Sequence, residues 1–131
     1  MIRIRPALRS DCPEILEIYN EAVLNTTASY DYEPRTLEHR QHWFDDHHQA
    51  GLPIFVAVND SARIVGWSAL NRYHDRKGYR FTSENSVYIA PDYRGQGIGK
   101  QLLAPLIESA RNDHCSSVTT RWIRQDLERT Q

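Results

Sequence analysis

The segment Tyr93–Lys100, which reads Tyr-Arg-Gly-Gln-Gly-Ile-Gly-Lys, constrains the fold more than any other part of the chain. Its three glycines, Gly95, Gly97 and Gly99, alternate directly before a stretch with helical periodicity. Glycine lets the backbone turn sharply and leaves no side chain between the peptide N–H groups and a ligand. A helix N-terminus adds unpaired N–H donors and a partial positive charge. The segment therefore predicts a binding site for a phosphate or pyrophosphate group.

Two common phosphate-binding loops do not fit these residues. A dinucleotide-binding G-x-G-x-x-G motif read from Gly95 needs a glycine where Lys100 stands, and it needs a β-α-β context near the start of the chain. A Walker A motif that ends on Gly99 and Lys100 needs a glycine at Arg94 and a serine or threonine at Gln101. The glycine loop must therefore belong to another class of phosphate-binding site.

The bulk composition predicts one globular domain. The chain has 131 residues, of which 40% are hydrophobic and 25% charged, and its formal net charge of -1 gives no electrostatic footprint for nucleic acid. No apolar run approaches the roughly 20 residues that a membrane helix needs, so we expect a soluble, cytoplasmic protein without a membrane partner. Cys12 and Cys115 show no metal-binding or disulfide spacing, and we expect two reduced thiols.

Hydrophobic periodicity predicts the order β-α-α-β-β-β-α-β, an α+β domain with a mainly antiparallel sheet. The pattern Asp11-x-x-Glu14 predicts a capping box at the start of the first helix. The expected elements are a strand near residues 2–7, helices over 11–23 and from 36, a hairpin of 54–58 and 64–70, a charged loop over 71–80, a strand over 81–89, a helix over 98–110 and a last strand over 116–120.

The glycine loop resembles the pyrophosphate loop of the GNAT family of N-acetyltransferases, whose core pattern is Q/R-x-x-G-x-G/A. The stretch from Arg94 to Gly99 matches this pattern completely. The resemblance implies that acetyl-CoA is a cosubstrate and that the strand before the loop pairs with its pantetheine arm. The residues implied for acetyl-CoA binding are Val87, Tyr88 and Ile89 on the strand and Arg94, Gly95, Gln96, Gly97, Ile98, Gly99 and Lys100 on the loop.

The residues upstream of the loop are similar to the phosphinothricin and methionine sulfoximine acetyltransferase branch, whose pattern is F-R-x-R-x-A-Y-x-x-T-x-E-x-S-V-Y-V. The matching positions are Arg76, Tyr79, Thr82, Glu84, Ser86, Val87 and Tyr88. His74 and Lys77 depart from the pattern. The resemblance runs from Ile2 to about Val118 and implies a small amino-acid-like amine as the acceptor.

Acetyl transfer needs an uncharged amine, and Glu84 is the candidate base that would remove its proton. Burial beside a strand can raise the pKa of a glutamate toward neutrality, and the alternative is an exposed glutamate in a simple ion pair. Arg76 and Arg80 are candidates for holding an acceptor carboxylate, and the alternative is two solvated arginines. The residues expected to line the acceptor site are Ser29, Tyr30, Arg76, Tyr79, Arg80 and Thr82.

The histidines of the second helix invite a metal-binding interpretation. His39 and His42 share a helix face, and His47 and His48 follow about a turn later. These residues do not form a complete set of metal ligands, and the acetyltransferase branch that the chain resembles needs no metal. We therefore expect a solvated helix face without a metal ion.

The last residues depart from the family, which continues with an Asn-x-x-Ser/Ala segment, a further helix and two strands. We expect an incomplete GNAT-like domain over 1–120 and an atypical tail over 121–131. Truncation or a frameshift near residue 116 is one explanation, and completion of the sheet in a homodimer is the other. Two function classes stay open: an N-acetyltransferase for a phosphinothricin- or methionine sulfoximine-type amine, and a non-catalytic acyl-CoA-binding or interaction domain.

Overall fold

The computed structural model describes residues 1–25, 35–74, 81–112 and 118–122, with side-chain positions for residues 1–24, 35–71 and 85–109. The described strands are β1 (Arg3–Pro6), β2 (Ile54–Val58), β3 (Ile64–His74), β4 (Phe81–Ile89) and β5 (Val118–Trp122). The described helices are α1 (Cys12–Asn25), α2 (Leu37–Ala50) and α3 (Ile98–Asn112), and short 3-10 turns span Arg9–Asp11 and Pro91–Tyr93. This order confirms the predicted α+β fold.

The strands form one mixed sheet in the order β1-β2-β3-β4-β5. The first four strands pair antiparallel, and β5 pairs parallel to β4 with Ser83 opposite Val118 and Val87 opposite Trp122. The predicted hairpin of β2 and β3 is confirmed, and its tight turn is organised by Asn59, whose side-chain oxygen accepts from the Ser61 and Arg63 N–H groups.

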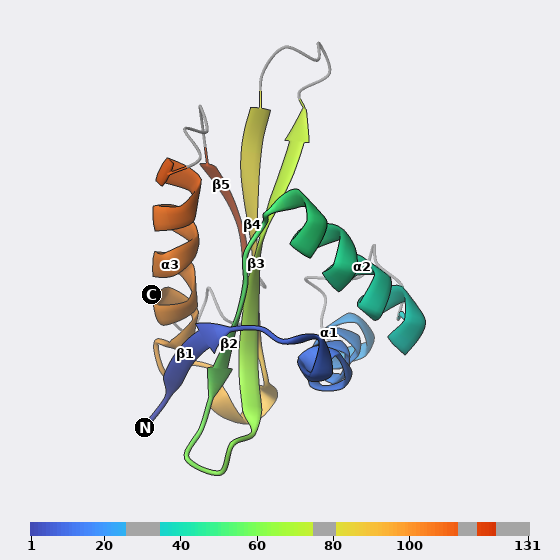
Figure 1. Cartoon of the computed structure of the whole chain (residues 1–131). Coiled ribbons are helices and arrows are strands. Elements are labelled where there is room, and N and C mark those ends of the chain that lie inside the picture. Colours follow the sequence, from blue (N-terminus) through green and yellow to red (C-terminus); the bar gives the residue numbers. More distant parts are fainter. Residues whose placement is uncertain (26–34, 75–80, 113–117, 123–131) are drawn as a thin grey trace.

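Helices cover both faces of the sheet, with α3 on one face and α1 and α2 on the other (Figure 1). Apolar residues of β3 and β4 alternate between the two faces, because successive side chains of a strand point to opposite sides. Val65, Val87 and Ile89 pack with Ile98 and Leu102 of α3. On the other face, the cluster consists of Ile15, Ile18, Tyr19, Ala22 and Val23 of α1 with Ile54, Val56, Val58, Ile64, Trp67, Ala69, Tyr88 and Ala90.

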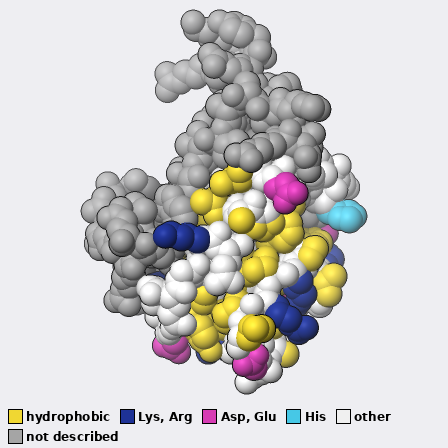
Figure 2. All heavy atoms as spheres, turned by 90° about the vertical axis from the view of Figure 1, so that its left-hand side faces the viewer, with side chains coloured by type: hydrophobic (Ala, Val, Ile, Leu, Met, Phe, Trp, Pro, Cys, Tyr) yellow, Lys and Arg dark blue, Asp and Glu magenta, His cyan; other side chains and the backbone are white. Residues whose placement is uncertain are grey.

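The α3 face is closely packed. A Cβ atom at Gly66 would lie 2.9 Å from Ile89 Cδ1 and 3.2 Å from the Tyr88 carbonyl oxygen, so only glycine lets β4 and α3 approach β3 this closely. Figure 2 looks onto this side of the molecule and shows hydrophobic side chains gathered there. Ile2, Ile4 and Phe55, which are half-buried, extend the α3 cluster toward β1 and β2.

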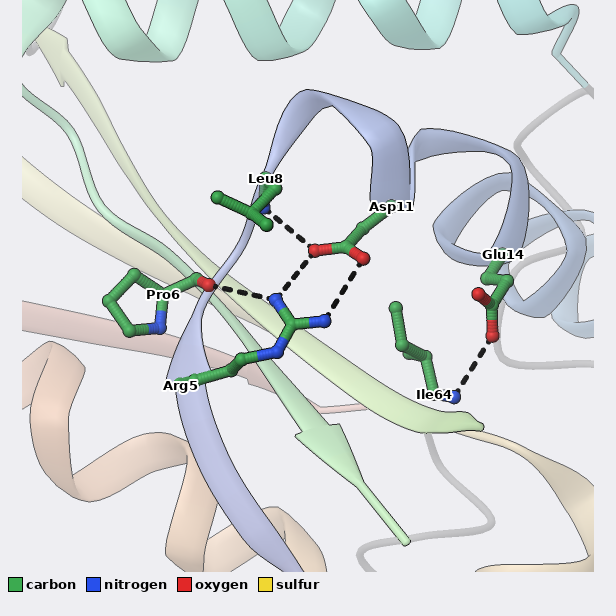
Figure 3. Close-up of polar contacts among 6 residues, drawn as sticks. All are labelled: Arg5, Pro6, Leu8, Asp11, Glu14 and Ile64. Carbon is green, nitrogen blue, oxygen red and sulfur yellow. Dashed lines mark hydrogen bonds and ion pairs between the residues drawn. The ribbon is translucent and has the colours of Figure 1, made fainter. Parts of the chain in front are cut away.

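The predicted capping box at the start of α1 is wrong (Figure 3). The Asp11 carboxylate accepts from the Leu8 N–H at 2.7 Å and from both terminal nitrogens of Arg5 at 2.8 and 3.1 Å. Glu14 does not reach back along its own helix, and instead accepts from the Ile64 N–H at 3.0 Å. The local pattern is overridden because β1 and β3 supply donors that the sequence spacing does not reveal.

Two predicted boundaries move. Residues Asn71–His74, expected in a charged loop, extend β3 because residues of β4 from Phe81 to Glu84 provide their register partners. The last strand runs from Val118 to Trp122, two residues beyond its expected end. Both shifts come from pairing with a neighbouring strand, which propensity along the chain does not report.

Candidate functional site

The glycine loop connects β4 to α3 as predicted. The 3-10 turn Pro91–Tyr93 follows β4, Gly95 and Gly97 both adopt φ of 80°, and α3 begins at Ile98. A Cβ atom at Gly97 would meet nothing within 4 Å, so the positive φ, rather than crowding, requires glycine there. The Gln101 N–H reaches the Gly97 carbonyl at 3.4 Å, so the N–H groups of residues 98–100 precede the helical hydrogen-bond ladder.

The Arg94 side chain anchors this loop to the rest of the protein. Its Nε donates to the Ile89 carbonyl at 3.1 Å, and its Nη2 lies 2.8 Å from Glu21 Oε2 on α1. Only 9% of the Arg94 side chain is exposed. The guanidinium thus faces inward, and the groups that the loop presents outward are its backbone N–H groups and the exposed residues Gln96 and Lys100.

The end of β4 extends beyond the last residue that pairs with β5. Val87, Tyr88 and Ile89 are all buried, and β3 pairs with each of them. Within the described part of the chain, the register pairing with β5 ends at Val87, and β4 continues through Tyr88 and Ile89 beyond that last pair. Backbone N–H and C=O groups along the edge of a strand can pair with an extended, amide-containing ligand.

A cavity of about 220 Å³ lies on the opposite face of the sheet from α3. It runs over β3 and β4 and is bordered by α1 and α2. The lining residues are Tyr19, Arg35, His39, Arg40, Trp43, Trp67, Ala69, Asn71, Ser86 and Tyr88. We call this cavity the aromatic pocket, because the Tyr88 ring stacks on Trp67 at 4.8 Å and lies 5.4 Å from the Tyr19 ring.

Arg40 of α2 is buried in the aromatic pocket. Its residue is 4% exposed, and its guanidinium carbon lies 4.5 Å from the Trp43 ring centroid, 4.6 Å from that of Tyr19 and 5.5 Å from that of Trp67. Burial lowers the pKa of Arg40, although an arginine remains protonated in proteins. Among the described residues, no acceptor meets its Nε, and the buried Trp67 Nε1 also lacks an acceptor.

A chain of polar contacts leads from α2 to β4 along one side of the pocket. His47 Nδ1 lies 3.0 Å from the Trp43 carbonyl, which only accepts, so this nitrogen carries a proton. His47 Nε2 lies 2.9 Å from Asn71 Oδ1, and the Asn71 amide nitrogen donates to Ser86 Oγ at 2.9 Å. These contacts fix the side chain of Asn71 at the pocket wall.

The candidate base Glu84 lies on β4 with its backbone opposite Asn71 of β3 and Thr119 of β5. Strand alternation puts its position on the same face as Ser86 and Tyr88, both of which line the aromatic pocket. Position 84 thus lies on the sheet face that borders the pocket, while its side chain is outside the described set. Thr82 is likewise described by its backbone only, and Ser29, Tyr30, Arg76, Tyr79 and Arg80 lie outside the described residues.

The aromatic pocket has a positive electrostatic character. Arg35, His39 and Arg40 line it, and none of its described lining residues is acidic. Desolvation lowers the pKa of His39, and the neighbouring charges of Arg35 and Arg40 lower it further. Such a site favours an anionic or electron-rich group of a ligand.

The expectation of a solvated histidine face on α2 is wrong for His47. Its residue is 8% exposed, because the helix turns it toward β3. His39, His42 and His48 are exposed, and His42 lies 3.5 Å from Asp46. The described residues contain no group of three potential metal ligands.

Cys12 is a buried free thiol whose pKa is raised, mainly by desolvation, and Cys115 is outside the described residues. No helix in the described ranges combines the length and apolar character that crossing a bilayer requires.

Reasoning from the sequence missed Tyr19, Arg40, Trp67 and Asn71 as lining residues of the aromatic pocket. For Arg40 a signal was available, because it recurs at helical spacing with the aromatic residues Trp43 and Phe44, and a charged residue on an apolar helix face needs a reason. Tyr19, Trp67 and Asn71 gave no such signal, because aromatic and amide side chains are ordinary in helices and strands.

Comparison with known proteins identifies relatives of this arrangement. The model of the "Acetyltransferase (GNAT) family" matches residues 13–130. An L-methionine sulfoximine/L-methionine sulfone acetyltransferase from Pseudomonas aeruginosa is 45% identical over 108 residues, which are 82% of this chain and 63% of that protein. The L-amino acid N-acyltransferase MnaT from Escherichia coli is 38% identical over 83% of this chain and 63% of its own length.

A solved structure agrees with the fold. The putative acetyltransferase yncA from Salmonella typhimurium, determined with its cofactor acetyl-CoA, superposes with a TM-score of 0.79 at 33% identity, covering 88% of this chain and 66% of that one. The chain spans about 63% of the length of the two curated relatives. The strand–glycine loop–helix unit, the mixed sheet and the family match over residues 13–130 agree with one another, and the chain belongs to the GNAT acetyltransferase family.

Proposed function

We propose that the protein is an N-acetyltransferase that moves an acetyl group from acetyl-CoA to the amine of a small amino-acid-like substrate. The observation that carries this proposal is the position of β4. Its carboxyl end runs beyond the last pair with β5 and leads into the glycine loop, and one of its faces lines the aromatic pocket through Ser86 and Tyr88. A cosubstrate along the edge and an acceptor in the pocket would meet at this strand.

The glycine loop would hold the pyrophosphate of acetyl-CoA. Backbone N–H groups from Gly95 to Lys100 would donate to its oxygens, helped by the partial positive charge at the start of α3. Arg94 would act by holding the loop in place through Glu21 and Ile89, since its guanidinium is already occupied by them. The end of β4 beyond its last pair with β5 would pair with the amides of the pantetheine arm.

Glu84 would be the general base, directly or through a water molecule. It would take a proton from the acceptor ammonium or amine, whose nitrogen then attacks the thioester carbonyl carbon. Backbone N–H groups near the end of β4 would stabilise the developing oxyanion. The carbon–sulfur bond breaks, and the coenzyme A thiolate leaves and takes up a proton.

The acceptor class follows from the relatives and from the pocket. The relatives act, by their names, on methionine sulfoximine, methionine sulfone and L-amino acids. The pocket combines aromatic walls with positive charge and polar groups at Asn71 and Ser86, which suits a small zwitterionic molecule. Ser29, Tyr30, Arg76, Tyr79, Arg80 and Thr82 remain predicted acceptor-binding residues.

A non-catalytic acyl-CoA-binding domain is the second candidate function. The observation that favours it is that the loop and the strand edge depend on backbone groups alone, while the chain spans 63% of its relatives' length. Such a domain would bind acetyl-CoA without transferring the acetyl group.

Calorimetry with acetyl-CoA, combined with an assay for released coenzyme A thiol, separates the two functions. The acceptor panel should contain L-methionine sulfone, L-methionine sulfoximine, phosphinothricin and several ordinary L-amino acids. We expect saturable acetyl-CoA binding and thiol release with at least one member. Binding without release across the panel would favour the second function, and absence of binding would contradict both.

A further inference from the structure

We propose that Arg40, in the wall of the aromatic pocket, takes part in recognising the carboxylate of the acceptor amino acid. This inference rests on the proposed acetyl transfer for its choice of ligand, and it adds a recognition residue on α2 to those predicted from the sequence. The geometry that points to it is a buried guanidinium that lines a cavity whose described lining residues include no acidic one.

A buried cation normally has a carboxylate or several carbonyl groups as partners, because the desolvation of a charge is costly. Arg5, by comparison, pairs with Asp11, and Arg94 pairs with Glu21. Arg40 is 4% exposed, yet none of the ion pairs among the described residues includes its guanidinium, and its Nε has no hydrogen-bond acceptor. The Tyr19, Trp43 and Trp67 rings stabilise the guanidinium in part through cation–π contacts, which do not use the Nε donor.

The residues around Arg40 favour an anion, and the volume of the cavity limits the size of that anion. The cavity of about 220 Å³ has room for a small molecule, and it is lined by Arg35 and His39 but by no acidic residue among those described. Trp67 Nε1 is a second buried donor without an acceptor in the same pocket. A carboxylate has oxygen atoms for both kinds of donor, and arginine can bind it through two parallel N–H groups.

The position of Arg40 also agrees with the chemistry at β4. Its guanidinium shares the Trp67 ring with Tyr88, which stacks on that ring and lies two residues from the backbone position of Ser86 on β4. An α-amino acid whose carboxylate reaches Arg40 has its amine on the adjacent Cα, two bonds from the carboxylate carbon, and this amine would lie on the side of Ser86 and position 84. Arg40 would thus orient the nucleophile as well as select the acid.

The test compares L-methionine sulfone with its carboxamide, which lacks only the negative charge and one oxygen. Trp43 and Trp67 line the pocket, so tryptophan fluorescence reports binding without requiring turnover. We expect the wild-type protein to bind the acid more tightly than the amide. Arg40→Gln should weaken acid binding about 10–100-fold and leave amide binding unchanged, since a hydrogen-bonded charge pair contributes roughly that much. Arg40→Lys should recover part of the preference, because it retains the charge.

Arg63→Gln is the matched control. Arg63 is exposed in the turn between β2 and β3, and its substitution removes the same charge as Arg40→Gln. It should bind both compounds like the wild type. Thermal unfolding and acetyl-CoA binding of each variant report whether the fold is retained, and Arg40→Lys serves as the test if Arg40→Gln does not fold.

Several outcomes would overturn the inference. The first is that Arg40→Gln weakens binding of the acid and of the amide equally. The second is that Arg40→Gln or Arg40→Lys keeps the wild-type preference for the acid over the amide, while Arg76→Gln loses this preference entirely. The third is that methionine sulfone does not bind saturably to the wild type. The thiol-release assay keeps the two proposals apart. Binding that depends on Arg40 without thiol release would contradict acetyl transfer alone, and thiol release with an unchanged acid preference in Arg40→Gln would contradict the Arg40 assignment alone.

Discussion

The two faces of the central sheet are built in different ways. On the α3 face, apolar residues such as Val87, Ile89 and Leu102 pack closely, and the buried Ser68 hydroxyl donates to the Leu102 carbonyl at 3.1 Å. On the face covered by α1 and α2, a cavity remains, and the buried donors Arg40 Nε and Trp67 Nε1 have no acceptor among the described residues. The comparison separates a face that holds the fold together from a face that leaves polar groups available to a ligand.

The same β4 strand contributes to both faces, which explains how the protein can combine them. Its odd-numbered positions Val87 and Ile89 face the α3 cluster, while Ser86 and Tyr88 line the aromatic pocket. Close packing on one side fixes the strand, and the fixed strand presents the other side to the pocket. We therefore expect substitutions on the pocket face to change binding and turnover, and substitutions on the α3 face to change stability.

The largest expected effect is that of Glu84→Gln on the pocket side of β4. If Glu84 is the general base, this change should lower kcat about 10²–10⁴-fold, because an amide cannot take the proton. Acetyl-CoA affinity and the free energy of unfolding should stay at wild-type values. Thiol-release kinetics with the best acceptor measure the effect. Glu17→Gln, an exposed carboxylate of α1, is the control, and wild-type turnover of Glu84→Gln would remove Glu84 from the mechanism.

Leu102→Ala tests the α3 face. The Leu102 side chain is fully buried, so its truncation should lower the free energy of unfolding by about 2–5 kcal/mol through lost burial and a new cavity. Urea denaturation measures this change, and methionine sulfone binding by the folded fraction should be unaffected. Leu103→Ala, at a half-buried position of the same helix, should cost clearly less. Equal costs at both positions would contradict the picture of a closely packed α3 face.

Gly97→Ala tests whether the loop conformation itself binds acetyl-CoA. An alanine at φ of 80° is strained by about 1–2 kcal/mol, so we expect acetyl-CoA affinity to fall about 5–30-fold as the loop relaxes. Calorimetry measures the affinity. Gly51→Ala is a close control, because Gly51 has φ of 71° and also has open space around its Cβ, but it lies at the end of α2. A similar loss of acetyl-CoA affinity in both variants would refute a specific role for the loop.

The smallest expected effect is that of substituting Asp11, which precedes α1 and whose carboxylate accepts hydrogen bonds from other groups of the protein. Desolvation raises its pKa, but hydrogen bonds from Arg5 and the Leu8 N–H outweigh this and leave the pKa lowered. The carboxylate therefore stabilises the fold above the unfolded pKa of about 3.9, and this contribution is lost as the pH falls through the lower folded pKa.

We expect Asp11→Asn to cost about 1 kcal/mol at pH 7 and to reduce the loss of stability between pH 4 and pH 2. Urea denaturation across this pH range measures both effects. Asp60→Asn, whose side chain is 80% exposed, should leave the profile unchanged. If the free energy of unfolding of Asp11→Asn changed with pH in parallel with that of the wild type, Asp11 would contribute no pH-dependent stability. The contrast between Asp11, whose hydrogen bonds stabilise the fold, and the polar groups of the aromatic pocket would then weaken.

Much of the fold was predictable because its signals are local. The helical periodicity of α1 and α3, the Asn59 turn between β2 and β3, and the glycine spacing before α3 each depend on residues close in sequence. Errors arose where a distant partner decided the outcome. Glu14 was expected to cap its own helix but binds the Ile64 N–H fifty positions away, and Asn71 joined β3 because β4 offered a partner.

The candidate site divides along the same line. The loop from Arg94 to Lys100 and the family could be predicted from the amino-acid sequence, because a phosphate-binding loop works through backbone groups whose geometry is set by glycines and by an adjacent helix. The contact of Arg94 with Glu21 and the enclosure of Arg40 by aromatic rings on α1, α2 and β3 became visible in the folded chain alone. The burial of a charge and the absence of its partner are properties of packing between distant segments, and no spacing along the chain encodes them.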